Sequence, residues 1–323
     1  MRYRVLGEVG IEVSVIGFGA STFGDVYGTV RASTAERAVA VAIDHGINLF
    51  DVSPYYGHTL AETRLGQAFA GKRSKIFLGT KCGRYGVDEF DFSGETLTRN
   101  FEQSLRRLKT DYVDLLQAHD IEFGHIAQIL GETLPAMRRL QKQGKVRFLG
   151  LTGYWPGLLA RTALAGKVDC ILNYCHGNLF VDDMDAELVP MTEQTGIGLL
   201  NASPLHMGLL ANKPIPDWHP APSSVRDAAR QVRAFCEAQG IDPAILALRV
   251  CLDHPAVAST IVGISSESEV IAACEALEWT PPVEVLQQVR KIIEPAHNVL
   301  WRSGLEQNQD ASLSAARGHD ASH

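Results

Sequence analysis

Residues 48–51, 75–81 and 113–119 read NLFD, KIFLGTK and VDLLQAH, and these three runs decide the fold. Each run is short and apolar, and each is followed by a segment with the apolar spacing of a helix. Continuous apolar runs, rather than alternating ones, are typical of parallel strands that helices cover on both faces. The three runs therefore predict repeated strand–helix units in a parallel sheet.

The same alternation of apolar runs and helical segments fills the chain. Five further strands are expected at residues 13–19, 146–153, 169–176, 197–203 and 259–265. Because βα crossovers are right-handed, eight such units close into a (β/α)8 TIM barrel, an α/β fold. Residues 2–19 are expected to open with an N-terminal β-hairpin that leads into the first strand. We expect Ser33 or Thr34 to cap the first helix, and the last helix to cover 267–278.

An open, doubly wound sheet is the alternative fold. Such sheets usually carry a GxGxxG turn directly before a helix, whereas the turn at residues 17–24 reads GFGASTFG and no helix begins directly after it. The barrel is therefore preferred, as a single domain over residues 1–305. Residues 206–223 hold four prolines and are expected to form a long loop at the barrel rim. The small, polar residues 306–323 are expected to be a disordered, flexible tail.

Composition narrows the possible functions. The 323 residues carry a net charge of −7 without a basic stripe, which disfavours nucleic-acid or anionic-membrane partners. No apolar run approaches the ~20 residues that span a bilayer, and the opening residues lack the apolar core of a secretion signal. We therefore expect a cytoplasmic protein, with its six scattered cysteines reduced. The histidines show no metal-ligand spacing, so no metal site is expected.

Four ionisable residues lie at the ends of the three runs, namely Asp51, Tyr56, Lys81 and His119. If the strands are neighbours about 4.8 Å apart, these side chains meet at one rim. A nearby ammonium favours tyrosinate, so Lys81 is expected to lower the pKa of Tyr56, while Asp51 holds Lys81 in place. Tyr56 would then be a general acid for a carbonyl or a general base for an alcohol. His119 would hydrogen-bond the substrate oxygen, and the natural partner is a hydride carrier.

Residues 48–69, NLFDVSPYYGHTLAETRLGQAF, resemble the signature of the aldo-keto reductase family. Similar matches follow in order over residues 1–280: TKC at 80–82, VDLLQAHD at 113–120, QGKVRFLGLTG at 143–153, ASPLHMGLL at 202–210 and IVGISSESEV at 261–270. The resemblance implies a barrel that binds a nicotinamide cofactor without a Rossmann domain. It also implies that Asp51, Tyr56, Lys81 and His119 form the catalytic tetrad, with Tyr56 as the proton donor or acceptor.

Four shorter stretches resemble one branch of that family, the L-galactose dehydrogenase or aldose 1-dehydrogenase branch. They are HDIEFG at 119–124, LNYCHGNL at 172–179, NASPLHMGLL at 201–210 and PDWHPA at 216–221. Enzymes of this branch act on sugars such as L-galactose or L-fucose and oxidise a cyclic hemiacetal carbon to a lactone. The resemblance thus implies a small-molecule sugar substrate and Tyr56 as general base. It gives no indication of oligomeric state.

The resemblance and the loop after the eighth strand together predict the cofactor contacts. These are Thr152, Asn173, Ser203, Leu205, Gly208, Gly263, Ser265 and Glu267. Thr152 and Asn173 are expected at the carboxamide, and a helix N-terminus after Gly263 suits a phosphate. Acidic Glu267 and Glu269 would repel a 2′-phosphate, with no basic residue between 262 and 278. NAD is therefore expected rather than NADP.

Aromatic and polar residues of the rim loops are the expected substrate contacts, because they suit the CH faces and hydroxyls of a sugar. They are Tyr27, Tyr55, Asp120, Trp155, His176, His206 and Trp218. Three alternatives stay open. The chain could be an NADPH-dependent reductase of small aldehydes, or have an activity like that of pyridoxal 4-dehydrogenase. It could also be a nicotinamide-sensing regulatory subunit, as channel β-subunits resembling this family are.

Overall fold

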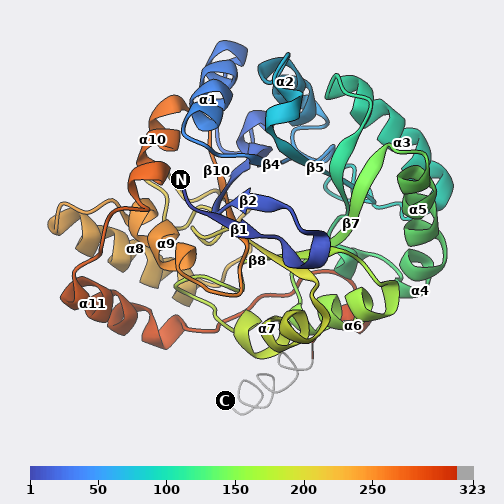
Figure 1. Cartoon of the computed structure of the whole chain (residues 1–323). Coiled ribbons are helices and arrows are strands. Elements are labelled where there is room, and N and C mark those ends of the chain that lie inside the picture. Colours follow the sequence, from blue (N-terminus) through green and yellow to red (C-terminus); the bar gives the residue numbers. More distant parts are fainter. Residues whose placement is uncertain (311–323) are drawn as a thin grey trace.

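The computed structural model describes residues 1–310 and confirms the barrel. Eight parallel strands close in the order β10-β3-β4-β5-β6-β7-β8-β9 (Figure 1). Their bounds are β3 Ile16–Gly19, β4 Leu49–Asp51, β5 Phe77–Cys82, β6 Val113–Ala118, β7 Val146–Gly153, β8 Cys170–Tyr174, β9 Gly198–Ala202 and β10 Ser259–Gly263. Seven of them lie within the runs predicted from sequence, and β5 extends one residue beyond its run, to Cys82. Most of their residues are buried, as expected for parallel strands that are covered on both faces.

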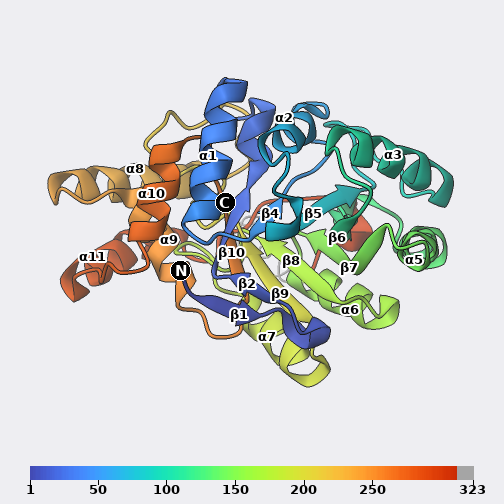
Figure 2. The same cartoon turned by 45° about the horizontal axis from the view of Figure 1, so that its top comes forward.

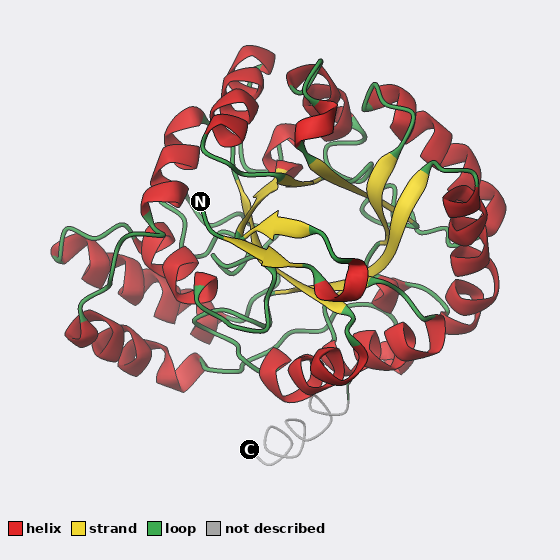
Figure 3. Cartoon of the chain, viewed as in Figure 1, coloured by secondary structure: helices red, strands yellow, loops and turns green. Residues whose placement is uncertain are grey.

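Helices form an outer ring around these strands (Figure 3). They are α1 Ala32–Asp44, α2 Leu60–Ala68, α3 Gly94–Arg107, α4 Ile126–Gln128, α5 Leu134–Lys142, α6 Pro156–Gly166, α7 Met184–Thr195, α8 Ser223–Ala238, α9 Pro243–Leu252, α10 Glu267–Glu275 and α11 Val283–Ile293. Two expectations were wrong. The residue before α1 is Arg31, so Ser33 and Thr34 lie inside the helix instead of capping it. Helix α11, which follows Pro281 and Pro282, was not predicted.

The N-terminal hairpin closes the amino-terminal end of the barrel. Strands β1 Tyr3–Val5 and β2 Glu12–Ser14 pair antiparallel and lie across that end (Figures 1 and 2). Leu6 and Val13 are fully buried and pack against the lumen side chains of the first residues of the barrel strands, including Leu49 and Phe77. Burying these apolar groups fills the lower lumen, so the opposite end is left for chemistry.

Small residues in the middle of the lumen make room for one large polar side chain. A methyl group on Gly150 would lie 3.1 Å from Gln117 Cγ, and one on Gly79 would lie 3.7 Å from Gln117 Nε2. Gln117 fills this space with 0% exposure, directly beneath the rim. Its position matters because its amide contacts a predicted catalytic residue, as described below.

The start of the expected tail contacts the barrel. Residues 306–308 form a 3-10 turn, and Asn308 Nδ2 donates to the carbonyl oxygens of Glu122 and Gly124, both at 2.8 Å. Asp310 accepts a hydrogen bond from the Gly157 amide at 2.7 Å. The rest of the expected tail, 311–323, lies outside the described residues.

Two further expectations concern cysteines and membranes. All six cysteines are free thiols, and five of them are buried, as predicted. Along residues 1–310, no helix is both long and apolar enough to cross a bilayer.

Candidate active site

The four predicted catalytic residues gather at the carboxyl ends of β4, β5 and β6. Asp51 is the last residue of β4, Lys81 is the fifth residue of β5, and His119 directly follows β6. Tyr56 lies in the loop that joins β4 to α2. Because parallel neighbours end at the same rim, the strand order alone brings these groups together.

Lys81 and Asp51 form a buried ion pair. Lys81 Nζ donates to the Asp51 carboxylate and, at 3.0 Å, to the Val52 carbonyl. The second Asp51 oxygen accepts a hydrogen bond from Gln117 Nε2 at 2.9 Å. Lys81 is only 2% exposed, so an unpaired charge here would be costly. The contact confirms that Asp51 holds Lys81 in place, and it adds Gln117 as a support that sequence reasoning missed.

His119 carries a neutral imidazole at the barrel rim. Burial lowers the pKa of His119 to about 3, so the ring is uncharged near neutral pH. Ser53 Oγ lies 3.0 Å from His119 Nδ1 and accepts a hydrogen bond from the Tyr55 amide. The Ser53 hydroxyl proton is then free to point at Nδ1, which leaves the histidine proton on Nε2. His119 can therefore donate a hydrogen bond to a substrate oxygen.

Tyr56 is half-buried between His119 and Lys81. Its ring meets the imidazole edge-on at 5.8 Å and 85°, and Lys81 Nζ lies 5.1 Å from the ring centroid. The expected lowering of the Tyr56 pKa was wrong. Burial raises that pKa above its ordinary value, the carboxylates of Asp51 and Asp120 raise it further, and Arg84 opposes them. The Lys81 charge is already compensated by Asp51, so Tyr56 is a protonated phenol in this structure.

Close backbone packing fixes the loop that carries Tyr56. A methyl group on Gly24 would lie 2.5 Å from the carbonyl carbon of Tyr56, and one on Gly57 would lie 2.3 Å from the Gly24 carbonyl oxygen. Gly57, His58 and Thr59 all have positive φ angles, of 61°, 47° and 77°. Only glycine adopts this region without cost, so the turn after Tyr56 is held by its surroundings.

A second buried carboxyl lies beneath the loop that follows His119. Glu122 Oε1 accepts hydrogen bonds from the Tyr154 amide at 3.2 Å, the Tyr174 hydroxyl at 3.0 Å and the Ser303 hydroxyl at 3.1 Å. Burial raises the pKa of Glu122 to about 8, with the Asp120 charge adding to the effect. Glu122 is therefore protonated near neutral pH. It was not among the predicted site residues.

The expected substrate residues divide into two groups. Tyr55 and Asp120 lie beside His119, and Tyr27 meets Trp218 across the rim at 5.8 Å between ring centroids. Trp218 is 50% exposed. A role of these four residues in substrate binding stays a prediction.

The structure does not bring Trp155, His176 and His206 to the tetrad. All three are fully buried. Trp155 Nε1 donates to the Ser303 carbonyl at 2.8 Å, and His206 packs edge-on against Trp301 at 5.1 Å. They pack beneath the C-terminal segment, which sequence reasoning had placed partly outside the domain.

The residues expected at the carboxamide have other partners in this structure. Thr152 Oγ1 accepts from the Asp120 amide at 2.9 Å and donates to the Asp120 carboxylate at 3.3 Å. Asn173 Nδ2 donates to the carbonyls of Gly153 and Tyr154, both at 2.9 Å. Strand alternation turns Asn173 away from the lumen. Tyr174 occupies the lumen position next to it, against the same inner cluster as Leu6.

The expected phosphate end lies at β9, β10 and α10. Ser203, Leu205 and Gly208 are half-buried, and Gly263 and Glu267 are exposed. Ser266 caps α10, and Ser265 donates from both its amide and its hydroxyl to Glu269. Lys213 Nζ, from the long loop, lies 3.3 Å from Glu269 Oε1. The structure thus adds one cation that the local sequence did not show.

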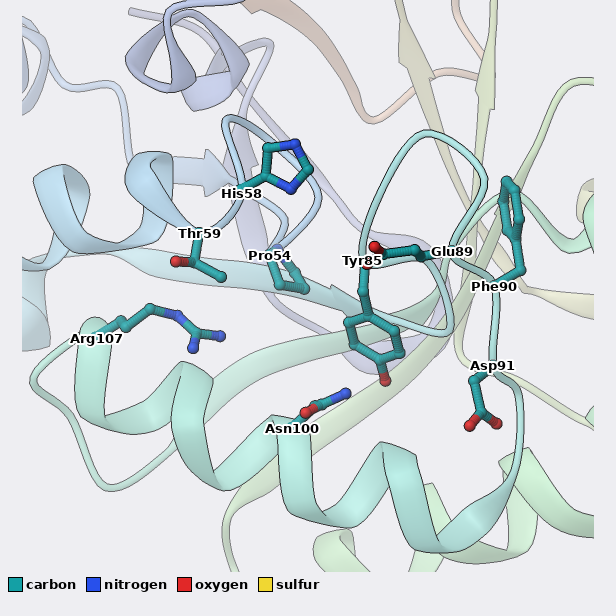
Figure 4. Close-up of a pocket in the computed structure, with 9 residues that line it drawn as sticks. All are labelled: Pro54, His58, Thr59, Tyr85, Glu89, Phe90, Asp91, Asn100 and Arg107. Carbon is teal, nitrogen blue, oxygen red and sulfur yellow. The ribbon is translucent and has the colours of Figure 1, made fainter.

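A separate cavity of about 460 Å³ lies behind the tyrosine loop (Figure 4). Its lining includes Pro54, His58, Tyr85 and Asn100, and it contains none of the four tetrad residues. This cavity is therefore separate from the tetrad.

A barrel with a buried lysine–aspartate pair, a neutral histidine and a phenol at its carboxyl rim defines a class of enzyme. It is an oxidoreductase that moves a proton at a carbonyl or alcohol oxygen while hydride moves at the carbon. Residues 15–294 match the model of the aldo/keto reductase family, so the chain belongs to that family. Its members use NAD(P)H.

Three relatives cover nearly the same length. The chain is 43% identical over 316 residues to L-galactose dehydrogenase of Arabidopsis thaliana, which covers 94% of this chain and 98% of that protein. It is 30% identical over 295 residues to D-arabinose 1-dehydrogenase of Saccharomyces cerevisiae, covering 84% and 87%. An aldo-keto reductase of Bacillus halodurans, solved in its holo form, shares 27% identity with a TM-score of 0.75, covering 96% and 100%.

Proposed function

We propose that this protein oxidises an aldose at C1 to the lactone, with NAD as the hydride acceptor. The main support is the 43% identity to L-galactose dehydrogenase over almost the whole of both chains. The chain also has all four residues of the tetrad, Asp51, Tyr56, Lys81 and His119. The identity to D-arabinose 1-dehydrogenase supports the same reaction class. The bound nicotinamide would supply the chemistry of accepting hydride from C1.

His119 and Tyr56 would bind and remove the hydroxyl proton of the substrate. His119 Nε2 donates a hydrogen bond to the anomeric oxygen and orients it, and Tyr56 accepts the hydroxyl proton as the carbon is oxidised. Because the pKa of Tyr56 is raised by burial, oxidation needs a phenolate that is scarce at neutral pH. The rate of oxidation should therefore climb as the pH rises.

The rim has room and donors for the nucleotide. Gly263 is exposed at the end of β10, and Ala202 and Tyr174 are half-buried at the ends of β9 and β8, whereas the other five barrel strands end on buried residues. The first turn of α10, with Ser265 and Ser266 before it, would hold a phosphate. Ser203, Leu205 and Gly208 would line the cofactor, and Thr152 would reach its carboxamide.

Charge at the α10 N-terminus supports NAD over NADP. Glu267 is exposed, and Glu269 lies beside it with Lys213 compensating one carboxylate. A 2′-phosphate here would meet a net negative charge, whereas a ribose diol can donate hydrogen bonds to a carboxylate.

The cytoplasmic location expected from the sequence stays a prediction, and so does the disorder expected of the tail.

A panel of substrates with both nucleotides tests the proposal. L-galactose, L-fucose, D-arabinose and pyridoxal are each mixed with NAD or NADP, and absorbance of the reduced nucleotide is followed. We expect turnover of at least one aldose, faster with NAD. If none of the sugars is oxidised with either nucleotide, the proposed function is wrong.

The protonated Tyr56 favours a second candidate, an NADPH-dependent reductase of small aldehydes. A phenol with a raised pKa is ready to donate a proton to a carbonyl oxygen. Rates in both directions and the affinities for NADPH and NAD separate the two candidates. Tight NADPH binding with fast aldehyde reduction and slow sugar oxidation would select the reductase.

A further inference from the structure

Asp120 holds an unusual position directly after the catalytic histidine. Its backbone is left-handed, with φ 50° and ψ 61°, and its side chain is 5% exposed. One carboxylate oxygen lies 3.6 Å from His119 Nε2, the nitrogen that faces the reacting oxygen. A buried carboxylate beside the catalytic nitrogen indicates a function beyond packing.

Arg84 fixes the other side of this carboxylate. Arg84 Nη1 lies 2.5 Å from Asp120 Oδ2. The guanidinium lies over the ring of Tyr55 at 3.9 Å and near the rings of Phe90 and Phe123 at 5.1 and 5.3 Å. Phe90 and Phe123 stack on each other at 4.4 Å. The cation is thus held by aromatic faces and aimed at Asp120.

These contacts keep a negative charge at the rim. Burial alone would raise the pKa of Asp120, but the charges of Arg84 and Lys81 and the Arg84 hydrogen bond act against burial, and the pKa is lowered. Because His119 is itself neutral near neutral pH, Arg84 is the permanent cation that faces this carboxylate. An ionised carboxylate accepts hydrogen bonds from hydroxyls strongly and selectively.

We propose that Asp120, oriented by Arg84, accepts a hydrogen bond from the hydroxyl on the carbon next to the reacting carbon. The enzyme would therefore prefer a substrate with a vicinal diol over its deoxy analogue. This inference rests on the proposed aldose oxidation. The reacting oxygen lies between Tyr56 and His119, and vicinal hydroxyls are within hydrogen-bond reach of each other. A hydroxyl on the adjacent carbon therefore meets the Asp120 oxygen beside His119 Nε2. Asp120 contacts the substrate, and Arg84 is a positioning residue that acts through it.

The test compares kcat/KM for the best aldose of the panel with kcat/KM for its 2-deoxy analogue. The wild-type protein should prefer the full sugar by about 10- to 100-fold, as for a hydrogen bond to a charged group. Asp120→Asn should lower that preference about tenfold, because an amide keeps the shape but not the charge. Asparagine also tolerates the left-handed backbone, so the fold is kept.

Two further variants make the result specific. Arg84→Lys keeps a positive charge but loses the planar fork and the stacking, so it should lower the preference by a smaller factor than Asp120→Asn. Asp227→Asn, on α8, removes an exposed carboxylate that pairs with Arg230 and should leave the preference unchanged.

The outcomes separate this inference from the proposed function. A preference that falls in Asp120→Asn but not in Asp227→Asn supports it. If Asp120→Asn slows both sugars equally, Asp120 is only structural and the inference is overturned while aldose oxidation stands. If no aldose is oxidised at all, both the proposed function and this inference are wrong.

Discussion

Replacing Gly24 by alanine should disable the enzyme through a residue that touches no substrate. The new methyl group would lie 2.5 Å from the Tyr56 carbonyl carbon and 2.6 Å from the Gly57 nitrogen. Carbon atoms in contact prefer about 3.5 Å, so the Tyr56–Gly57 peptide must shift by about 1 Å. A 1 Å misplacement of a reacting group costs about 10²-fold in rate. Overpacking of this kind also costs about 1–3 kcal/mol of stability.

Gly131→Ala is the matched control, because a methyl group there meets nothing within 4 Å. It should leave kcat unchanged and raise the free energy of unfolding by about 0.4–1 kcal/mol. The measurements are initial rates of nucleotide reduction and thermal unfolding by circular dichroism. Wild-type kcat and melting temperature in a folded Gly24→Ala variant would refute the claim that backbone packing positions Tyr56.

Three further variants test the tetrad and its surroundings. Tyr56→Phe should abolish hydride transfer while leaving nucleotide binding by fluorescence titration nearly intact, and wild-type turnover would contradict its role. Lys81→Met leaves the buried Asp51 carboxylate without a partner, so urea denaturation should show that the free energy of unfolding falls by about 3–5 kcal/mol. The control Lys75→Met, at an exposed position, should not show this fall. The folded protein holds the Glu122 proton to about pH 8, whereas the unfolded chain releases it near 4.5, so the Glu122 contribution to stability should fall as pH rises between these values. Glu122→Gln removes this contribution, so thermal melts should show that the stability of the variant falls less with pH, or rises more, than that of the wild type; an equal slope in both proteins would show that Glu122 is not the titrating group.

The barrel and the tetrad were predictable because both depend on local pattern. Continuous apolar runs identify buried parallel strands, and parallel strands place their carboxyl ends at one rim. Helix α11 also carried a signal, since apolar residues recur with helical spacing from Val283 to Ile293 after two prolines. The sequence is therefore sufficient to predict α11.

The errors concern groups that are far apart in the chain. The pKa of Tyr56 depends on Asp51 compensating Lys81 and on Asp120, none of which the local sequence orders in space. Arg84 reaches Asp120 across 36 positions, so neither segment predicts the contact. Likewise, Trp155 is buried by the Ser303 region, which lies 148 positions further along the chain.

The hydrogen bonds from Asn308 to the loop after the catalytic histidine also bear on how the enzyme is made. Residue 308 leaves the ribosome after all eight barrel strands, because it follows β10 in the chain. The barrel strands can therefore pair before this loop gains the hydrogen bonds from Asn308. Synthesis that stops between β10 and residue 308 should leave the catalytic loop without these hydrogen bonds.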